Sequence, residues 1–188
     1  MSDTFIDSDY SIDPQSVVDF WREVGPEGWF RKDPELDRTI TSRFGDLYER
    51  AARGHLDAWA DEPNGALALV ILLDQFPRNM FRGTPRAFET DEKALKLARA
   101  ALARGDHYHV GEDINQFFAM PLMHSEALAD QEACIRWMEE IGEENVPFAV
   151  EHRDIIQRFG RFPHRNAALG RQSRPDEEAF LADGGFQG

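Results

Sequence analysis

The 188-residue chain has a single cysteine, Cys134, and no apolar run near the roughly 18 residues that a membrane-spanning helix needs. One thiol excludes a disulfide within the chain and a metal site built from several cysteines. Residues 1–13 are acidic and polar, unlike the basic and then apolar start of a secretory signal. We therefore expect a cytoplasmic protein in which Cys134 packs among apolar neighbours.

Positive charge is also scarce, because 21 Lys and Arg residues face 35 Asp and Glu residues and the formal net charge is −14. Binding to nucleic acid or to an anionic membrane requires a basic surface, so neither partner is expected. The exception is the segment 152–174, which holds six arginines and one acid, Asp154. This cationic segment is either an anion site or a set of arginines that pair with acids elsewhere.

Several motifs of common enzymes and metal sites are missing. The chain has no glycine-rich phosphate loop, no dinucleotide-binding glycine pattern and no Gly-x-Ser-x-Gly nucleophile elbow. The histidines at 107, 109 and 124 lack the further ligands of a zinc site, and no di-iron helix pattern occurs. We therefore expect no metal and no cofactor.

The chain does have a clear pattern of helix starts and ends. Asp13-Pro14 and Asp33-Pro34 pair a capping acid with a proline suited to a first turn, and glycines are typical of helix ends. Between these signals apolar residues recur at helical spacing. The expected helices are 14–24, 34–53, 63–76, 90–104, 112–124, 126–141, 147–159 and 175–182.

Residues 66–73 are continuously apolar, which fits either a buried strand or a helix at the centre of a bundle. No partner strand with alternating apolar residues occurs, so we expect a helix. The predicted fold is all-α, an array of antiparallel helical hairpins with about seven to eight helices. One domain is expected over 14–182, after an acidic arm at 1–13 and before a flexible, glycine-rich tail at 183–188.

Two segments of similar sequence are the most distinctive feature, Phe76-Pro77-Arg78-Asn79 and Phe162-Pro163-His164-Arg165-Asn166. Proline is expected to end or bend the helix at each, leaving a rigid turn that presents arginine and asparagine. Such turns suit bidentate recognition of a carboxylate or phosphate. Alternatively, asparagine caps the next turn and arginine ties it to a neighbouring helix. The predicted ligand-binding residues are Arg78, Asn79, Arg82, Arg158, Arg161, His164, Arg165 and Asn166.

Two histidines are expected to face the interior or a cavity. His152 keeps helical spacing with Ile155, and His124 keeps it with Phe117 across a proline-kinked helix. A buried imidazole needs a hydrogen-bond partner, and Asp74, at the end of the apolar run, is an acid in an inward position. A network of His152, His124 and Asp74 would be either a structural polar core or a catalytic base with the acid that orients it.

Three blocks of sequence, 72–79, 121–126 and 152–171, resemble a bacterial family catalogued as domain of unknown function 924. The similarity extends over residues 17–181, nearly the whole chain. The resemblance implies a tetratricopeptide-like helical fold. It implies no activity, so no catalytic residue is carried over from the family.

Three functions are compatible with the sequence. The leading hypothesis is a binding module with an Arg/His/Asn-lined pocket for a small anion or an acidic peptide group. The second is an enzyme, hydrolytic or acid–base, in which His152 or His124 transfers protons while arginines hold the substrate. The third is a helical scaffold for protein–protein interaction whose arginines are internal staples. Neither the ligand nor the oligomeric state follows from the sequence.

Overall fold

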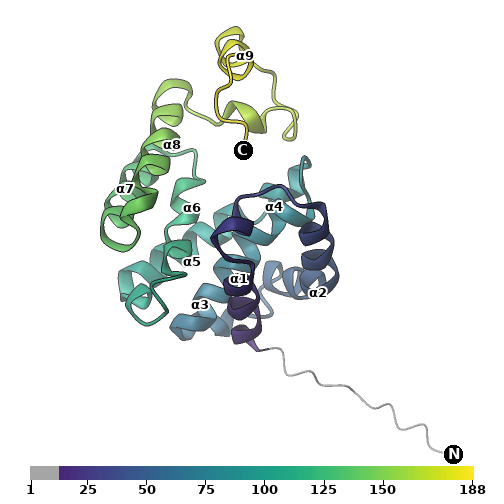
Figure 1. Cartoon of the computed structure of the whole chain (residues 1–188), viewed down its shortest axis with the longest axis vertical. Helices are drawn as coiled ribbons and strands as arrows, with labels where there is room; N and C mark the ends of the chain where they lie inside the picture. The colour runs from purple at the N-terminus through teal and green to yellow at the C-terminus, as the bar shows by residue number, and fades with distance from the viewer. Residues whose placement is uncertain (1–12) are drawn as a thin grey trace, which may run out of the picture.

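The computed structural model describes residues 13–188, and these residues form helices without any strand (Figure 1). The prediction of an all-α fold is therefore confirmed. The predicted acidic arm lies outside the described residues except for Asp13. None of the helices in the described part of the chain has both the length and the apolarity needed to cross a membrane.

The α-helices follow the predicted order along the chain. They are α1 (Pro14–Trp29), α2 (Pro34–Ala52), α3 (Pro63–Val70), α4 (Phe76–Met80), α5 (Asp91–Arg104), α6 (Met120–Met123), α7 (Leu128–Ile141), α8 (Val146–Phe159) and α9 (Pro175–Ala182). A π-helical segment, η2, spans Ile71–Gln75. Short 3-10 turns are η1 (Asp57–Asp61), η3 (Pro85–Phe88), η4 (Asp106–Tyr108), η5 (Asn115–Phe118), η6 (Glu143–Asn145) and η7 (Pro163–Arg165).

The first two helices begin at their predicted caps. The Asp13 carboxylate accepts a hydrogen bond from the backbone N–H of Gln15 at 3.0 Å, and Asp33 accepts from the N–H of Glu35 at 2.9 Å. Helix α1 runs past its predicted end at residue 24 through a kink at Gly25, where φ is 68°. Glycine tolerates this left-handed conformation, so the chain turns and continues as a second helical stretch.

The continuous apolar run forms the centre of the fold, as predicted. Residues 66–73 are almost completely buried in α3 and η2, and α3 packs against α1, α5 and η1. Around this centre the rings of Trp21, Phe76 and Phe117 meet edge to face. A helix that is apolar on all sides is stable only in such a position.

The first Phe-Pro segment is not a turn, which corrects the prediction made from sequence. Helix α3 continues through the π-helical residues into α4 and ends only at Met80. Pro77 has no N–H and so cannot donate to the carbonyl of Leu73, four residues earlier. That carbonyl instead accepts a hydrogen bond from the Thr90 hydroxyl at 2.6 Å. The π-helical turn and this external donor let the helix pass through the proline.

The predicted helix 112–124 is also different in the structure, where it is divided into η5 and the short α6. Pro121 stands in the first turn of α6, a position that proline favours as a helix start and not as a helix interior. His124 follows immediately as the C-cap residue. This places the His124 ring beside the end of the central helix.

The C-terminal part has a small core of its own. Ile155, Ile156 and Phe159 of α8 pack with Phe162, and Phe186 covers this cluster. Helix α8 ends at Gly160 with φ of 69°, and Pro163 then begins η7, so the second Phe-Pro segment is a turn as predicted. In Figure 1 the chain beyond α9 turns back toward the rest of the fold.

Candidate functional site

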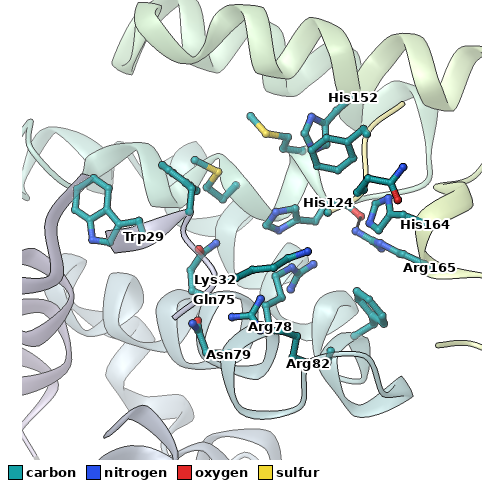
Figure 2. Close-up of a pocket in the computed structure, with 18 of the residues that line it drawn as sticks. Trp29, Lys32, Gln75, Arg78, Asn79, Arg82, His124, His152, His164 and Arg165 are labelled. Atoms are coloured by element: carbon teal, nitrogen blue, oxygen red, sulfur yellow. Dashed lines mark hydrogen bonds between the residues drawn. The ribbon is translucent and has the colours of Figure 1, made fainter. Parts of the chain in front are cut away.

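A cavity of ≈ 580 Å³ lies where α4, α6, α8 and η7 approach one another (Figure 2). Its wall carries five cationic side chains, Arg31, Lys32, Arg78, Arg82 and Arg165, and three histidines, His124, His152 and His164. Among the described residues no aspartate or glutamate lines it. The remaining wall is largely aromatic and apolar, with Trp29, Phe30, Phe88, Met120, Met123, Phe148 and Phe186. The cavity wall therefore has the opposite charge to the chain as a whole, which carries −14.

Asp74 and His124 form a hydrogen-bonded pair at one wall of the cavity. Asp74 is fully buried, and both of its carboxylate oxygens lie 2.8 to 2.9 Å from Nδ1 of His124. Burial alone would raise the pKa of Asp74, but the hydrogen bond with His124 and the Arg78 guanidinium outweigh burial and lower it. Because an ionised carboxylate only accepts hydrogen bonds, Nδ1 of His124 carries the hydrogen.

The electrostatic surroundings keep the His124 ring neutral. Burial, together with the Arg78 guanidinium, lowers the pKa of His124 more than Asp74 raises it. With the hydrogen on Nδ1, the Nε2 atom has a free lone pair. In Figure 2 the His124 ring lies in the cavity, between Trp29 on one side and His164 and Arg165 on the other. The ring can therefore accept a proton or a hydrogen bond from a molecule in the cavity.

The two Phe-Pro segments each bring one arginine to the cavity, and Asp91 lies between these arginines. Arg78 donates two hydrogen bonds to the Asp91 carboxylate at 2.9 and 3.0 Å, and Nη1 of Arg165 lies 3.5 Å from it. Asp91 and Asp74 balance these charges, but neither acid is part of the cavity wall. The two arginines are thus held in fixed positions at the cavity wall.

Arg165 is the more unusual of the two arginines because it is buried. Its Nη2 donates to the backbone carbonyl of His124 at 2.9 Å, and its guanidinium lies 4.6 Å from the Phe162 ring centre and 4.8 Å from that of Phe88. Burial and the neighbouring Arg78 lower the pKa of Arg165 to about 10. Its buried Nε has no hydrogen-bond partner within residues 13–188. Such a donor favours an added acceptor.

The other two histidines of the wall are neutral aromatic surfaces. Burial lowers the pKa of His152 to about 4 and that of His164 to about 3. Nδ1 of His152 lies 2.8 Å from the carbonyl oxygen of Phe148, so the ring is oriented by backbone and not by an acid. Both rings contact Phe186, with centroid distances of 4.5 Å for His152 and 5.1 Å for His164. His124 is the only one of the three with a carboxylate partner in the described residues.

Three of the predicted ligand-binding residues do not reach the cavity. Arg161 donates two hydrogen bonds to Glu177 at 2.7 and 2.8 Å, and Asn166 donates to the same carboxylate at 3.1 Å. Arg158 lies over the rings of Phe159 and Phe180. The alternative hypothesis, in which arginines tie neighbouring elements together, applies to Arg161, because its partner is the buried Glu177 on α9.

The remaining predicted residues do lie at the cavity. Arg78, Asn79, Arg82, His164 and Arg165 line it together with His124 and His152, and Asp74 stands directly behind His124. Asn79 and Arg82 are held by Asp37, at 2.8 Å for the Asn79 amide and 2.8 to 3.1 Å for the guanidinium. Asn79 and Arg82 therefore line the cavity with side chains that are already paired with Asp37.

Sequence reasoning missed the apolar part of the wall. Trp29 reaches the cavity because the kink at Gly25 turns the end of α1, and its indole N–H donates to the Trp21 carbonyl at 2.6 Å. Phe148 precedes His152 by one helical turn, and this spacing predicts that both lie on one helix face, but Phe148 is not among the predicted ligand-binding residues. No cluster of three or more potential metal ligands occurs in the described range.

Comparisons with known proteins identify relatives without an assigned activity. Residues 17–185 match the model of a family described as "Bacterial protein of unknown function (DUF924)". The chain is also 43% identical to a solved structure, the protein of unknown function ATU0120 from Agrobacterium tumefaciens, with a TM-score of 0.87. That similarity covers 90% of this chain and 97% of the other. No curated protein matches the chain.

Proposed function

Because the chain belongs to the bacterial family DUF924, whose function is unknown, we propose from the geometry alone that the protein binds a small anion in the cavity. One observation carries the proposal. In a chain of net charge −14, the cavity wall presents five Arg or Lys side chains and three histidines, and no aspartate or glutamate side chain from the described residues. Acids outside the wall pair with Arg31, Arg78, Arg82 and Arg165, so the wall itself carries cationic donors without acidic side chains, a composition that favours an anionic ligand.

The fixed positions of Arg78 and Arg165 support recognition and not only attraction. Each is already oriented by Asp91, so little side-chain entropy is lost when a ligand binds. Arg165 is buried, and hydrogen bonds to a charged group are stronger where water is excluded. An acidic peptide group remains within this proposal, since its carboxylate offers the same acceptors. A scaffold role accounts for the ion pairs of Arg161 and Arg174 with Glu177, but it does not account for the cationic and apolar side chains of the cavity wall.

Replacing Arg165 by glutamine is expected to weaken anion binding about tenfold or more, because a charge-assisted hydrogen bond is lost. The probes are inorganic phosphate and a series of mono- and dicarboxylates, measured by thermal shift and by calorimetry. Arg158→Gln is the matched control, since it removes the same charge outside the cavity. Absence of any probe binding to the wild type, or equal weakening by the control, contradicts the proposal.

A second candidate function, acid–base catalysis, is favoured by one specific observation. Asp74 holds Nδ1 of His124 in the arrangement that orients a catalytic base, which leaves Nε2 toward the cavity. His152 is less suited, because its pKa of about 4 makes it a weak base and its Nδ1 faces a backbone carbonyl. A substrate held by Arg78 and Arg165 would lie next to His124.

If the protein is an enzyme, His124→Gln is expected to lower kcat about a hundredfold or more, and His152→Gln far less. The measurement is turnover of a panel of anionic esters, amides and phosphoesters by the wild type and both variants. Asp74→Asn should lower kcat as well, because the amide no longer selects the reactive tautomer. Equal turnover by the wild type and His124→Gln removes the catalytic role.

A further inference from the structure

The cavity wall combines two surfaces of different chemistry. Arg165, Arg78 and His124 offer hydrogen-bonding groups at one side, whereas in Figure 2 Trp29 lies across the cavity from Arg165. Trp29 packs with Phe117 at 4.9 Å between ring centroids, and Met120 and Met123 belong to the same wall. A ligand that fills both parts has one charged group and one apolar group.

Exposed aromatic side chains gather at this cavity. Phe30 is 61% exposed and Phe148 is 57% exposed, and both line it. Within the described residues only Tyr108 and Leu128 are other large hydrophobic side chains with such exposure. Apolar surface concentrated beside a cavity marks a place where a binding partner buries it.

The cavity already receives one aromatic ring, from the chain itself. Phe186 lies against the neutral imidazoles of His152 and His164 and belongs to the wall. Because both imidazoles are uncharged, they provide ring faces and edges for stacking. Phe186, His152 and His164 therefore add aromatic surface to the wall of the cavity.

The size of the cavity and the apolar part of its wall favour some classes of anion over others. A cavity of ≈ 580 Å³ is in the range used by organic ligands and is much larger than inorganic phosphate. A sugar phosphate would gain nothing from Trp29, Met120 and Met123, because these side chains offer no free partner to its hydroxyl groups, although Gln75 and Asn145 of the wall carry amides. A single carboxylate, in contrast, matches the donors of Arg165 and Arg78.

We infer that the ligand is an organic monocarboxylate with an aryl or alkyl group, its carboxylate at Arg165 and Arg78 and its apolar group toward Trp29. This inference rests on the proposed function and specifies the ligand of the same site. The buried Nε of Arg165 has no partner in the described part of the chain, so this guanidinium retains a donor that the fold itself does not use. His124 then lies beside the bound group with its Nε2 accessible.

Four probes test the inference by calorimetry: 3-phenylpropionate, propionate, 3-phenylpropan-1-ol and inorganic phosphate. The expected result is that 3-phenylpropionate binds at least tenfold more tightly than each of the others, because only it uses both surfaces. Phe148→Ser should weaken 3-phenylpropionate and leave propionate unchanged, while Arg165→Gln weakens both. Because Phe148 is exposed, its replacement leaves the core intact. The Trp29 indole resonance should shift with 3-phenylpropionate and not with propionate.

The outcomes separate this inference from the proposed function. If phosphate or propionate binds as tightly as 3-phenylpropionate and the binding is lost in Arg165→Gln, the ligand class is overturned and anion binding stands. If the neutral alcohol binds as tightly as the acid, the carboxylate is irrelevant and both are overturned. If none of the probes binds the wild type at millimolar concentration, both are overturned as well.

Discussion

Replacement of Glu177 by glutamine is expected to lower the free energy of unfolding by about 3 kcal/mol, the loss typical of breaking a buried ion pair. The Glu177 carboxylate is fully buried. It accepts hydrogen bonds from Arg161, Asn166, the Arg174 side chain and the Arg174 backbone N–H, at 2.7 to 3.1 Å. The variant removes the negative charge and replaces one acceptor oxygen with an NH2 donor, so α9 should separate from the turn that follows α8.

The contribution of Glu177 to stability depends on pH, because the hydrogen bonds to its carboxylate lower its pKa. Hydrogen bonding from Arg161 is the largest cause that lowers the pKa of Glu177, to about 2 from an ordinary 4.5. A carboxylate with a depressed pKa stabilises the fold fully above pH 4.5, and this stabilisation is lost as pH falls toward 2. In Glu177→Gln that part of the acid dependence should disappear.

Urea unfolding of Glu177→Gln and of Glu178→Gln, compared at pH 7, measures the effect. Glu178 is the matched control, because it is the next residue on α9 and is exposed. Equal midpoints for the two variants would show that the Glu177 network contributes nothing to stability. Limited proteolysis then locates the change, which should appear first in residues 160–188.

Acidification below pH 6.5 is expected to destabilise the protein by about 3 kcal/mol by pH 4, through His152 alone. Burial lowers the pKa of His152 to about 4 in the folded state, compared with 6.5 for an ordinary histidine. Between these values the unfolded chain binds a proton that the folded chain does not, so the fold loses stability as pH falls. Burial has the same effect on His164, whose pKa falls to about 3.

The variant His164→Phe separates the contribution of His164 to this acid destabilisation from that of His152. The His164 Nδ1 is buried without a partner among the described residues, so phenylalanine removes a titrating group without removing a hydrogen bond of that atom. The slope of unfolding free energy against pH between 6.5 and 4 should become shallower, and stability at pH 7 should not fall. The exposed His109→Gln serves as control. An unchanged slope in His164→Phe contradicts the assignment.

The sequence alone determined the features that depend on local chemistry. Asp33 followed by proline specifies a helix start, because the carboxylate caps free N–H groups and proline needs none. An apolar run without alternation specifies a buried helix when no partner strand exists. The inward positions of Asp74 and His124 also followed from spacing, and the structure pairs these two side chains.

Only the tertiary structure decided which arginines reach the cavity. Arg161 and Arg165 lie four residues apart in one cationic segment, yet Arg161 binds Glu177 and Arg165 lies at the cavity near Asp91. The difference arises from acids distant in sequence. An arginine lies where its carboxylate partner is, and that position depends on how α5 and α9 pack.

The two Phe-Pro segments also show which features local sequence determines and which depend on tertiary contacts. Both have the same two residues, but Pro77 lies within a continuous helix and Pro163 begins a turn. At Pro77 the missing hydrogen bond is replaced by the Thr90 hydroxyl, which comes from another part of the chain. At Pro163 the preceding Gly160 has already ended the helix. Local sequence determined that each proline removes a donor, and tertiary contacts decided whether the helix continued, because only they can supply the replacement.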